Sequence, residues 1–522
     1  MSRRGDDLGA SEPVVHGRGL RRGFDVACDV VVVGSGAGGA TAALHLTEAG
    51  HRVIVLEEGP YIRREDYQRF QPTESVRRML REAGMLTALG LGQTPLIALT
   101  VGRVVGGSSV LTGGVCFRVP SEVHAHWEQE LGLPGLGERA LERAYEDVER
   151  RIEVRPVPVE MRSASTQAFV RGAERLDIPI HATRRNTGDD CEGNGRCNFG
   201  CPAGAKRGVD VAYLPDALAA GARLVSDALV EGLIVRDGRA VGVEGRLLGG
   251  RFGDPSHRFR VHAKVVVLAC GTIHTPGLLA RAGVRSPHLG RGITLHPSVR
   301  VVGRFPEVLN GWDGALQAVY ADRFDADGIK LVGVYTAVNI LAAGLPGVGP
   351  ELARRVRELP RTGVFGGMVH DEGGGSVHNT PGREPALTYR MAPRDLVRLR
   401  RTMRILCEMA LEGGAEEVYP PIFGLEPVRT LADARALETD PIDARRIECL
   451  AFHPLGSARM ANDARRGVVD ENAEVFELPG AFVLDGSVLP TSIGVNSQVP
   501  IMSVATESAW RLRERLATVG RA

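Results

Sequence analysis

A glycine-rich turn near the N-terminus has the spacing of a nucleotide-binding site. Gly34, Ser35, Gly36, Gly38 and Gly39 follow an apolar run at 30–33 and precede another at 40–49. The first glycine permits a tight turn, the second lets a pyrophosphate approach the backbone, and the third allows close packing of helix on strand. Free N–H groups at the start of the helix would then face the phosphates.

An acidic residue completes this site. Glu57 ends the next apolar run, 53–56. An acid in this position accepts hydrogen bonds from the ribose hydroxyls of an adenine nucleotide. Strand, glycine turn, helix and acid together predict a dinucleotide site, and they leave NAD and FAD both open.

Three of the eight cysteines, Cys191, Cys197 and Cys201, fall within eleven residues. Thiolates this close can ligate an iron–sulfur cluster or zinc. No fourth ligand lies nearby in the sequence, which disfavours tetrahedral zinc and a four-iron cluster. The alternative is a glycine-rich loop of small buried thiols, with or without one disulfide.

The overall composition is that of a globular protein. The 522 residues are 43% apolar and 24% charged, which excludes disorder, collagen and coiled coil as the main architecture. The 64 basic and 63 acidic residues nearly cancel, so net charge favours neither nucleic acid nor an anionic membrane as a partner. No apolar segment follows the N-terminal arginine pair, and we therefore expect a cytoplasmic protein.

One uncharged stretch has to be distinguished from a membrane span. Residues 331–348 carry no charge, but Gly333, Asn339, Gly344 and Pro346 interrupt them. β-Branched residues crowd the first half. This pattern predicts a strand and a loop under a substrate pocket, with no membrane span.

Periodicity places further elements around these residues. Predicted strands are 30–33, 53–56 and 481–484; predicted helices are 40–49, ending at Gly50, 395–412 and 501–516; residues 263–283 read as strand, glycine turn and helix start, and 300–390 as strand-rich. Strands that alternate with helices and a separate strand-rich part predict an α/β chain, α+β overall.

Five blocks in one order resemble the glucose–methanol–choline (GMC) oxidoreductases, from about residue 26 to the C-terminus. They are the turn at 34–39; Gly102 to Gly113 with Arg118; Val266 to Leu279; Leu289 to Arg291 with His296 and Pro297; and His453 to Met460 with Val469, Asp470, 483–490 and 494–496.

This resemblance implies FAD as the cofactor. It also implies a set of residues that bind it: Gly34, Ser35, Gly36, Gly38, Gly39, Glu57, Arg103, Gly106, Gly107, Ser108, Thr112, Val230, Gly271, Asp485 and Gly486. The family's paired catalytic positions, His–His or His–Asn, fall on His453 and Asn496.

Alcohol oxidation by hydride transfer needs a base for the hydroxyl proton and a partner that positions the oxygen. His453 is the predicted base, because the ordinary pKa of histidine lies near 6.5. Asn496 would hold the substrate oxygen or orient the imidazole through its neutral amide. His274 and His296 each lie close to a proline, and we interpret both as structural.

The expected architecture is a Rossmann-like FAD-binding domain with an inserted antiparallel-sheet substrate domain. Residues 1–24 would form a flexible tail. Residues 25–118, 208–300 and 450–522 would form the FAD domain, and 119–207 and 301–449 the substrate-binding cap.

The predicted function is oxidation of a small-molecule alcohol, long-chain or sterol-like, by an FAD-dependent GMC enzyme. O2, a quinone or a redox protein could be the electron acceptor. The cysteine spacing resembles that of GMC sugar dehydrogenases with an iron–sulfur cluster that pass electrons to a cytochrome, and this is the first alternative. The second is a non-catalytic flavin-binding protein.

Overall fold

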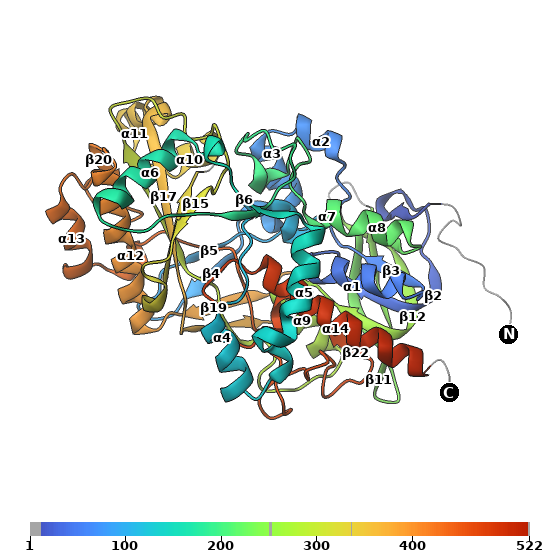
Figure 1. Ribbon diagram of the computed structural model, residues 1–522. Coiled ribbons are helices and arrows are strands. Elements are labelled where there is room, and N and C mark those ends of the chain that lie inside the picture. Colours follow the sequence, from blue (N-terminus) through green and yellow to red (C-terminus); the bar gives the residue numbers. More distant parts are fainter. Residues whose placement is uncertain (1–11, 250–252, 336, 520–522) are drawn as a thin grey trace.

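The computed structural model describes residues 12–249, 253–335 and 337–519. Two large sheets make up its two halves (Figure 1): the sheet with β2, β3 and β12 lies on the right, and the sheet with β15 and β17 on the left. The N-terminal strand β1 and the C-terminal helix α14 both belong to the right-hand half.

The first sheet has the order β1-β9-β3-β2-β12-β11-β10, and β22 also pairs with β12. Neighbours are parallel from β1 to β12 and at β22, and antiparallel from β12 to β10. The strands are β1 (Val14–His16), β9 (Arg223–Ser226), β3 (Val53–Leu56), β2 (Asp25–Val33), β12 (Pro255–Leu268), β11 (Arg239–Leu248), β10 (Ala228–Arg236) and β22 (Ala481–Val483).

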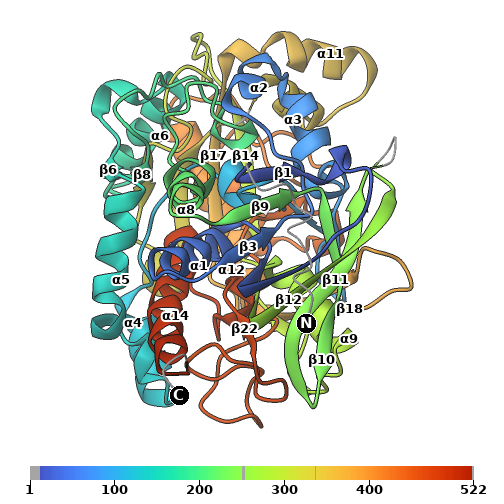
Figure 2. The same cartoon turned by 90° about the vertical axis from the view of Figure 1, so that its right-hand side faces the viewer.

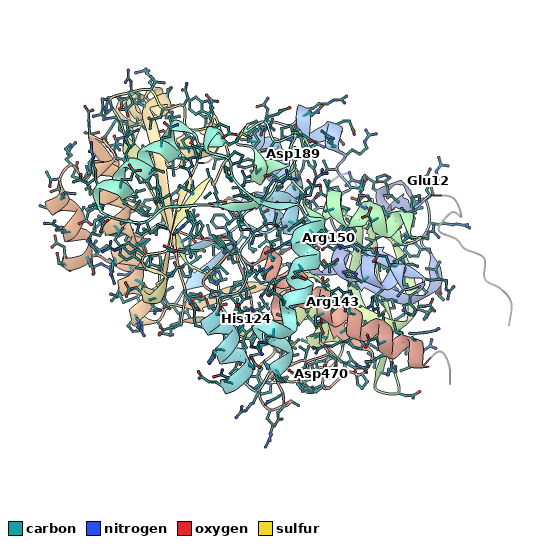
Figure 3. All side chains as sticks on the ribbon, viewed as in Figure 1. Glu12, His124, Arg143, Arg150, Asp189 and Asp470 are labelled. Carbon is teal, nitrogen blue, oxygen red and sulfur yellow. The ribbon has the colours of Figure 1, made fainter. Side chains whose placement is uncertain are left out.

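The centre of this sheet is covered on both faces, so its strands are continuously apolar. Val30, Val31 and Val32 of β2 are fully buried. The helix α1 (Ala37–Glu48) packs against α14 (Gln498–Val519), and α14 against α5 (Glu138–Arg151); Figure 2 shows these three helices on one side of the sheet. Arg143, labelled on α5 in Figure 3, lies 4.6 Å over the ring of Trp510 and ties α5 to α14.

The second sheet has the order β13-β18-β19-β4-β5-β21-β14-β17-β16-β15-β7, with β20 beside β14. Most neighbours are antiparallel. The strands are β13 (Arg291–Ile293), β18 (Gly374–His378), β19 (Ala386–Arg390), β4 (Thr87–Gly90), β5 (Ile97–Leu99), β21 (Cys449–Ala451), β14 (Ser298–Arg304), β17 (Thr362–Val369), β16 (Ile329–Val334), β15 (Val319–Ala321), β7 (His181–Ala182) and β20 (Glu417–Tyr419).

Helices cover the outer face of this sheet. The 20-residue α12 (Pro393–Glu412) packs on β14 and β17, and α6 (Ala164–Arg175) packs on α12 and β17. The other helices are α2 (Arg64–Arg69), α3 (Pro72–Met79), α4 (Ser121–Ala125), α7 (Val209–Ala212), α8 (Leu214–Ala219), α9 (Gly271–Arg281), α10 (Val338–Ala343), α11 (Gly349–Arg357) and α13 (Leu431–Thr439). A two-stranded ribbon joins β6 (Val154–Pro156) and β8 (Arg184–Asn186).

The predicted fold class, a Rossmann-like part with a largely antiparallel second part, is confirmed. Two local expectations need correction. Residues 14–16 of the predicted tail form β1 at the edge of the first sheet, because their backbone pairs with β9; residues 1–11 lie outside the described part. In 331–348, the strand β16 is followed by the short helix α10 in place of the expected loop.

The domain boundaries stay a prediction, and the sheets show how the chain alternates between the two halves. The strands β4 and β5, inside 25–118, pair in the second sheet. Among the described residues, no helix is both long and apolar enough to cross a bilayer.

Candidate active site

The glycine turn between β2 and α1 leaves space on one side only. A Cβ on Gly38 would lie 1.8 Å from the carbonyl oxygen of Leu484, and a Cβ on Gly39 2.0 Å from that of Gly34. Gly34 itself has φ +97°. A Cβ on Gly36 would meet nothing closer than Gly107 Cα at 3.9 Å. The other glycines let the backbone close up, and the space at Gly36 fits a pyrophosphate at the start of α1.

The Glu57 carboxylate ties the two predicted cofactor-binding loops together. It accepts hydrogen bonds from the N–H (3.0 Å) and hydroxyl (2.7 Å) of Ser35 and from the N–H of Gly59 (2.7 Å). The N–H of Gly106 donates to the same Ser35 hydroxyl at 3.0 Å. A carboxylate offers about four acceptor positions, so one remains for a ribose hydroxyl.

The second predicted cofactor-binding loop, residues 102–112, contains Gly106 and Gly107, which have φ +91° and +56°. The Ser108 hydroxyl accepts from the Gly102 N–H, and the Thr112 hydroxyl donates to Gln498 Oε1 at 3.1 Å, which joins the loop to the start of α14. The side chain of Arg103 does not belong to the cavity lining and lies 4.0 Å from Glu58.

Asp485 links the C-terminal segment to the start of α9. Its carboxylate accepts from the Gly271 N–H (2.8 Å), the Thr275 hydroxyl (2.6 Å) and the Ser487 N–H (2.7 Å). Gly271 has φ +76°. Burial raises the pKa of the Asp485 carboxyl above its ordinary value. The three donors hold this corner of the cavity rigidly.

One cavity of about 990 Å³ collects most of the predicted site residues. Those that line it are Gly34, Gly36, Gly38, Glu57, Gly107, Ser108, Thr112, Val230, Gly271, Asp485, Gly486, His453 and Asn496. Four of the predicted residues do not line the cavity: Ser35, Gly39, Arg103 and Gly106. The cavity size suits a dinucleotide together with a small molecule.

The predicted catalytic pair is close together in this cavity. Asn496 Nδ2 lies 3.2 Å from His453 Nε2. On the other side of the imidazole, His296 Nδ1 lies 3.2 Å from His453 Nδ1. Burial lowers the pKa of His453 to about 3, with the neighbouring His296 adding to the effect and Asp371 opposing it.

His296 has a specific hydrogen-bonding role. The backbone N–H groups of Ile493 and Gly494 both donate to its Nε2, at 3.2 and 3.1 Å. A neutral His296 therefore carries its proton on Nδ1 and donates it to His453 Nδ1. This bond favours the His453 tautomer with the proton on Nε2, whereas the Asn496 amide N–H that faces Nε2 at 3.2 Å favours the tautomer with the proton on Nδ1, the one that a base at Nε2 needs.

Sequence reasoning missed the contact between His296 and His453. The two residues are 157 positions apart, and the proline beside His296 suggested only a turn. His296 has φ +51°, and its N–H and that of Leu295 donate to the buried Asp371 carboxylate. His274 lines the cavity and lies 3.1 Å from Glu384.

The low pKa of His453 predicts a flat pH profile. Its imidazole stays neutral down to about pH 3, so protonation of His453 cannot slow the reaction near its ordinary pKa of about 6.5. We expect the anaerobic rate of flavin reduction by an alcohol to be constant between about pH 5 and 8. A stopped-flow series over this range measures it. A fall in rate centred near pH 6.5 would contradict the burial of this histidine.

Cys191, Cys197 and Cys201 line one small cavity, and they lack the arrangement of a metal site among the described residues. Among the residues that the structure describes, no three His, Cys, Asp or Glu side chains converge to hold a metal ion. Cys197 instead accepts a hydrogen bond at 3.0 Å from the buried guanidinium of Arg185. All three thiols are free. The candidate iron–sulfur cluster is therefore unsupported, and with it the sugar-dehydrogenase alternative.

The cysteine loop supports the cofactor-binding loop. The buried ammonium of Lys206 donates to the carbonyl oxygens of Val110, Thr112 and Cys197 at 2.6, 3.0 and 2.8 Å. Burial lowers the pKa of Lys206 to about 8. This sharing of one cation by two loops gives the cysteine segment a structural purpose.

Comparison with known proteins shows the family of this chain. The family model described as GMC oxidoreductase matches residues 28–298, and that of its C-terminal part matches 375–505. An uncharacterized GMC-type oxidoreductase of Mycobacterium tuberculosis is 36% identical over 479 residues, 91% of this chain and 74% of the relative. The long-chain-alcohol oxidase FAO4B of Arabidopsis thaliana is 31% identical, over 92% of this chain and 67% of its own length.

Solved structures share the fold. Pyridoxine 4-oxidase from Mesorbium loti superposes with a TM-score of 0.71 at 19% identity and covers 93% of this chain and 99% of its own. A formate oxidase of Aspergillus oryzae superposes with a TM-score of 0.72 at 16% identity, over 94% and 98% of the two chains. From the extent of the family match and the identity to its relatives, the chain belongs to the GMC oxidoreductase family.

Proposed function

We propose that this oxidoreductase uses FAD to oxidise the CH–OH group of an apolar alcohol to a carbonyl. The loops around Gly36, Glu57, Gly107 and Asp485 would hold the cofactor, because their backbone leaves space where phosphates need it. Bound FAD would supply the hydride acceptor. The observation that carries the proposal is the His453–Asn496 pair, 3.2 Å apart in the same cavity as these loops.

His453 and Asn496 would hold the hydroxyl oxygen of the substrate between them. As the base, His453 accepts the hydroxyl proton on Nε2. Before the transfer, its own proton must therefore be on Nδ1. The Asn496 amide N–H at Nε2 favours this tautomer, and the bond from His296 at Nδ1 favours the opposite one. Asn496 has an amide that does not titrate, so it can keep the oxygen in place throughout the reaction.

The second-sheet side of the cavity favours an apolar substrate. Its lining there includes Leu316, Val332, Val334, Tyr335, Ile340, Val364, Met368, Leu450 and Phe452. Val332, Val334, Leu450 and Phe452 keep part of their apolar surface accessible. Covering apolar surface gains about 25 cal/mol per Å², and a hydrocarbon chain can provide that cover. The long-chain-alcohol oxidase relatives point to the same class of substrate.

A panel of alcohols tests the substrate class. With an artificial electron acceptor, we expect kcat/KM for a long-chain primary alcohol to exceed that for glucose by about 100-fold or more, because sugar hydroxyls would be buried against apolar walls without partners. A sterol tests the bulkier alternative. Preference for the sugar would overturn the assignment to apolar alcohols.

A further inference from the structure

The apolar part of the cavity contains one cation. Among the described cavity-lining residues between 298 and 368, Arg300 is the only charged side chain. It lies on β14 and pairs in register with Gly366 of β17, which in turn pairs with Val332 of β16. A Cβ on Gly366 would meet the side chains of Val334 and Val332 at 3.1–3.6 Å, so apolar groups cover the strands next to β14.

Arg300 lies within reach of the proposed catalytic pair along the same cavity. Ser298 precedes it by two residues and shares its face of the strand, because side chains alternate; both residues line the cavity. Ser298 is paired with Leu450, three residues before His453. Arg300 comes four positions after His296, so their Cα atoms are at most about 14 Å apart. A chain-like molecule can therefore span the distance from His453 to Arg300.

The Arg300 guanidinium has more N–H donors than its contacts use. Its recorded hydrogen bond runs from Nη2 to Glu448 Oε1 at 3.2 Å, a single contact to a side chain that is 33% exposed and outside the cavity lining. Arginine has five N–H donors. A Cβ on Gly344 would lie 2.6 Å from Nη2, so a glycine makes room for the group to reach this place.

We propose that Arg300 binds an anionic group, a carboxylate in particular, at the end of the substrate chain remote from the oxidised hydroxyl. The substrate class is then an ω-hydroxy fatty acid or a similar apolar alcohol with an acidic end. A planar guanidinium in apolar surroundings suits a carboxylate, because it can donate two parallel hydrogen bonds. Partly exposed Glu448 would keep the cation partly neutralised when no substrate is bound. This inference rests on the proposed alcohol oxidation.

The test compares an ω-hydroxy fatty acid with its methyl ester and with the primary alcohol of equal chain length. In wild-type holoenzyme we expect the acid to have a kcat/KM about 10–100-fold above both neutral compounds, since a hydrogen bond to a charged group is strong in apolar surroundings. Arg300→Met should remove this preference and leave the kcat/KM of the neutral alcohol within about twofold. Arg300→Lys should retain part of the preference for the acid, because its ammonium keeps the charge but cannot donate two parallel hydrogen bonds.

Glu448→Gln is the matched control, because it breaks the ion pair and keeps the guanidinium. It should retain or increase the preference for the acid. Equal loss with Glu448→Gln and Arg300→Met would show that Arg300 serves only the ion pair and would overturn the inference, as would equal use of acid and neutral alcohol by the wild type. If the acid, its methyl ester and the primary alcohol all fail to reduce the flavin, the proposed function fails instead.

Discussion

His453→Ala should slow anaerobic flavin reduction by an alcohol by about 10²–10⁴, the usual contribution of a positioned acid–base group. The reason is the position of this cavity-lining imidazole between Asn496 and His296, with its Nε2 facing the Asn496 amide. The variant should bind FAD normally, because the loops around Gly36, Glu57 and Asp485 do not depend on it. Rapid mixing of the oxidised enzyme with alcohol in the absence of oxygen gives the rate.

Asn496→Ala is the companion variant. It should slow the reaction less, because the amide positions the oxygen and does not accept the proton. If His453→Ala reduces its flavin at nearly the wild-type rate, the base lies elsewhere. His296 or a carboxylate in the strand-rich 300–390 segment would then be the next to test.

Gly36→Val should yield a folded protein without flavin. The valine side chain would enter the space beside Gly36, where the nearest protein atom is 3.9 Å from the ideal Cβ. Since φ at this residue is −69°, the backbone itself tolerates a side chain. The absorbance spectrum after purification measures flavin content, and circular dichroism measures folding.

Gly38→Val is the control for this variant. Its Cβ would lie 1.8 Å from the backbone oxygen of Leu484, so we expect loss of soluble, folded protein. Wild-type protein stripped of its cofactor gives the reference melting temperature, because a bound ligand stabilises the folded state. Normal flavin content in Gly36→Val would remove the glycine turn from the cofactor site.

The local elements were predictable because each has a short-range signal. Apolar runs around a glycine turn predicted β2, α1 and β3 within a few residues, and the period of 3.6 predicted α12. The predictions failed where the pairing is long-range. Residues 14–16 form a strand only because β9, some 200 residues later, lies beside them.

The site divides in the same way. Gly36 and Glu57 stand in one continuous motif, whereas the His296–His453 contact joins segments that no local pattern connects. The role of Arg300 was not predictable from the sequence either, because it depends on the neighbouring apolar strands β16 and β17, which also line the cavity. The cysteine spacing suggested a metal site, but Cys197 faces Arg185 in the folded chain.

The most direct test of the proposed activity is a single turnover without oxygen. FAD-loaded protein is mixed with one equivalent of a long-chain primary alcohol, and the flavin absorbance and the carbonyl product are both quantified. We predict that the oxidised flavin band disappears, that about one aldehyde forms per flavin reduced, and that deuterium on the carbinol carbon slows the step. A flavin that stays oxidised with neutral long-chain alcohols, ω-hydroxy fatty acids and sterols alike would contradict the assignment.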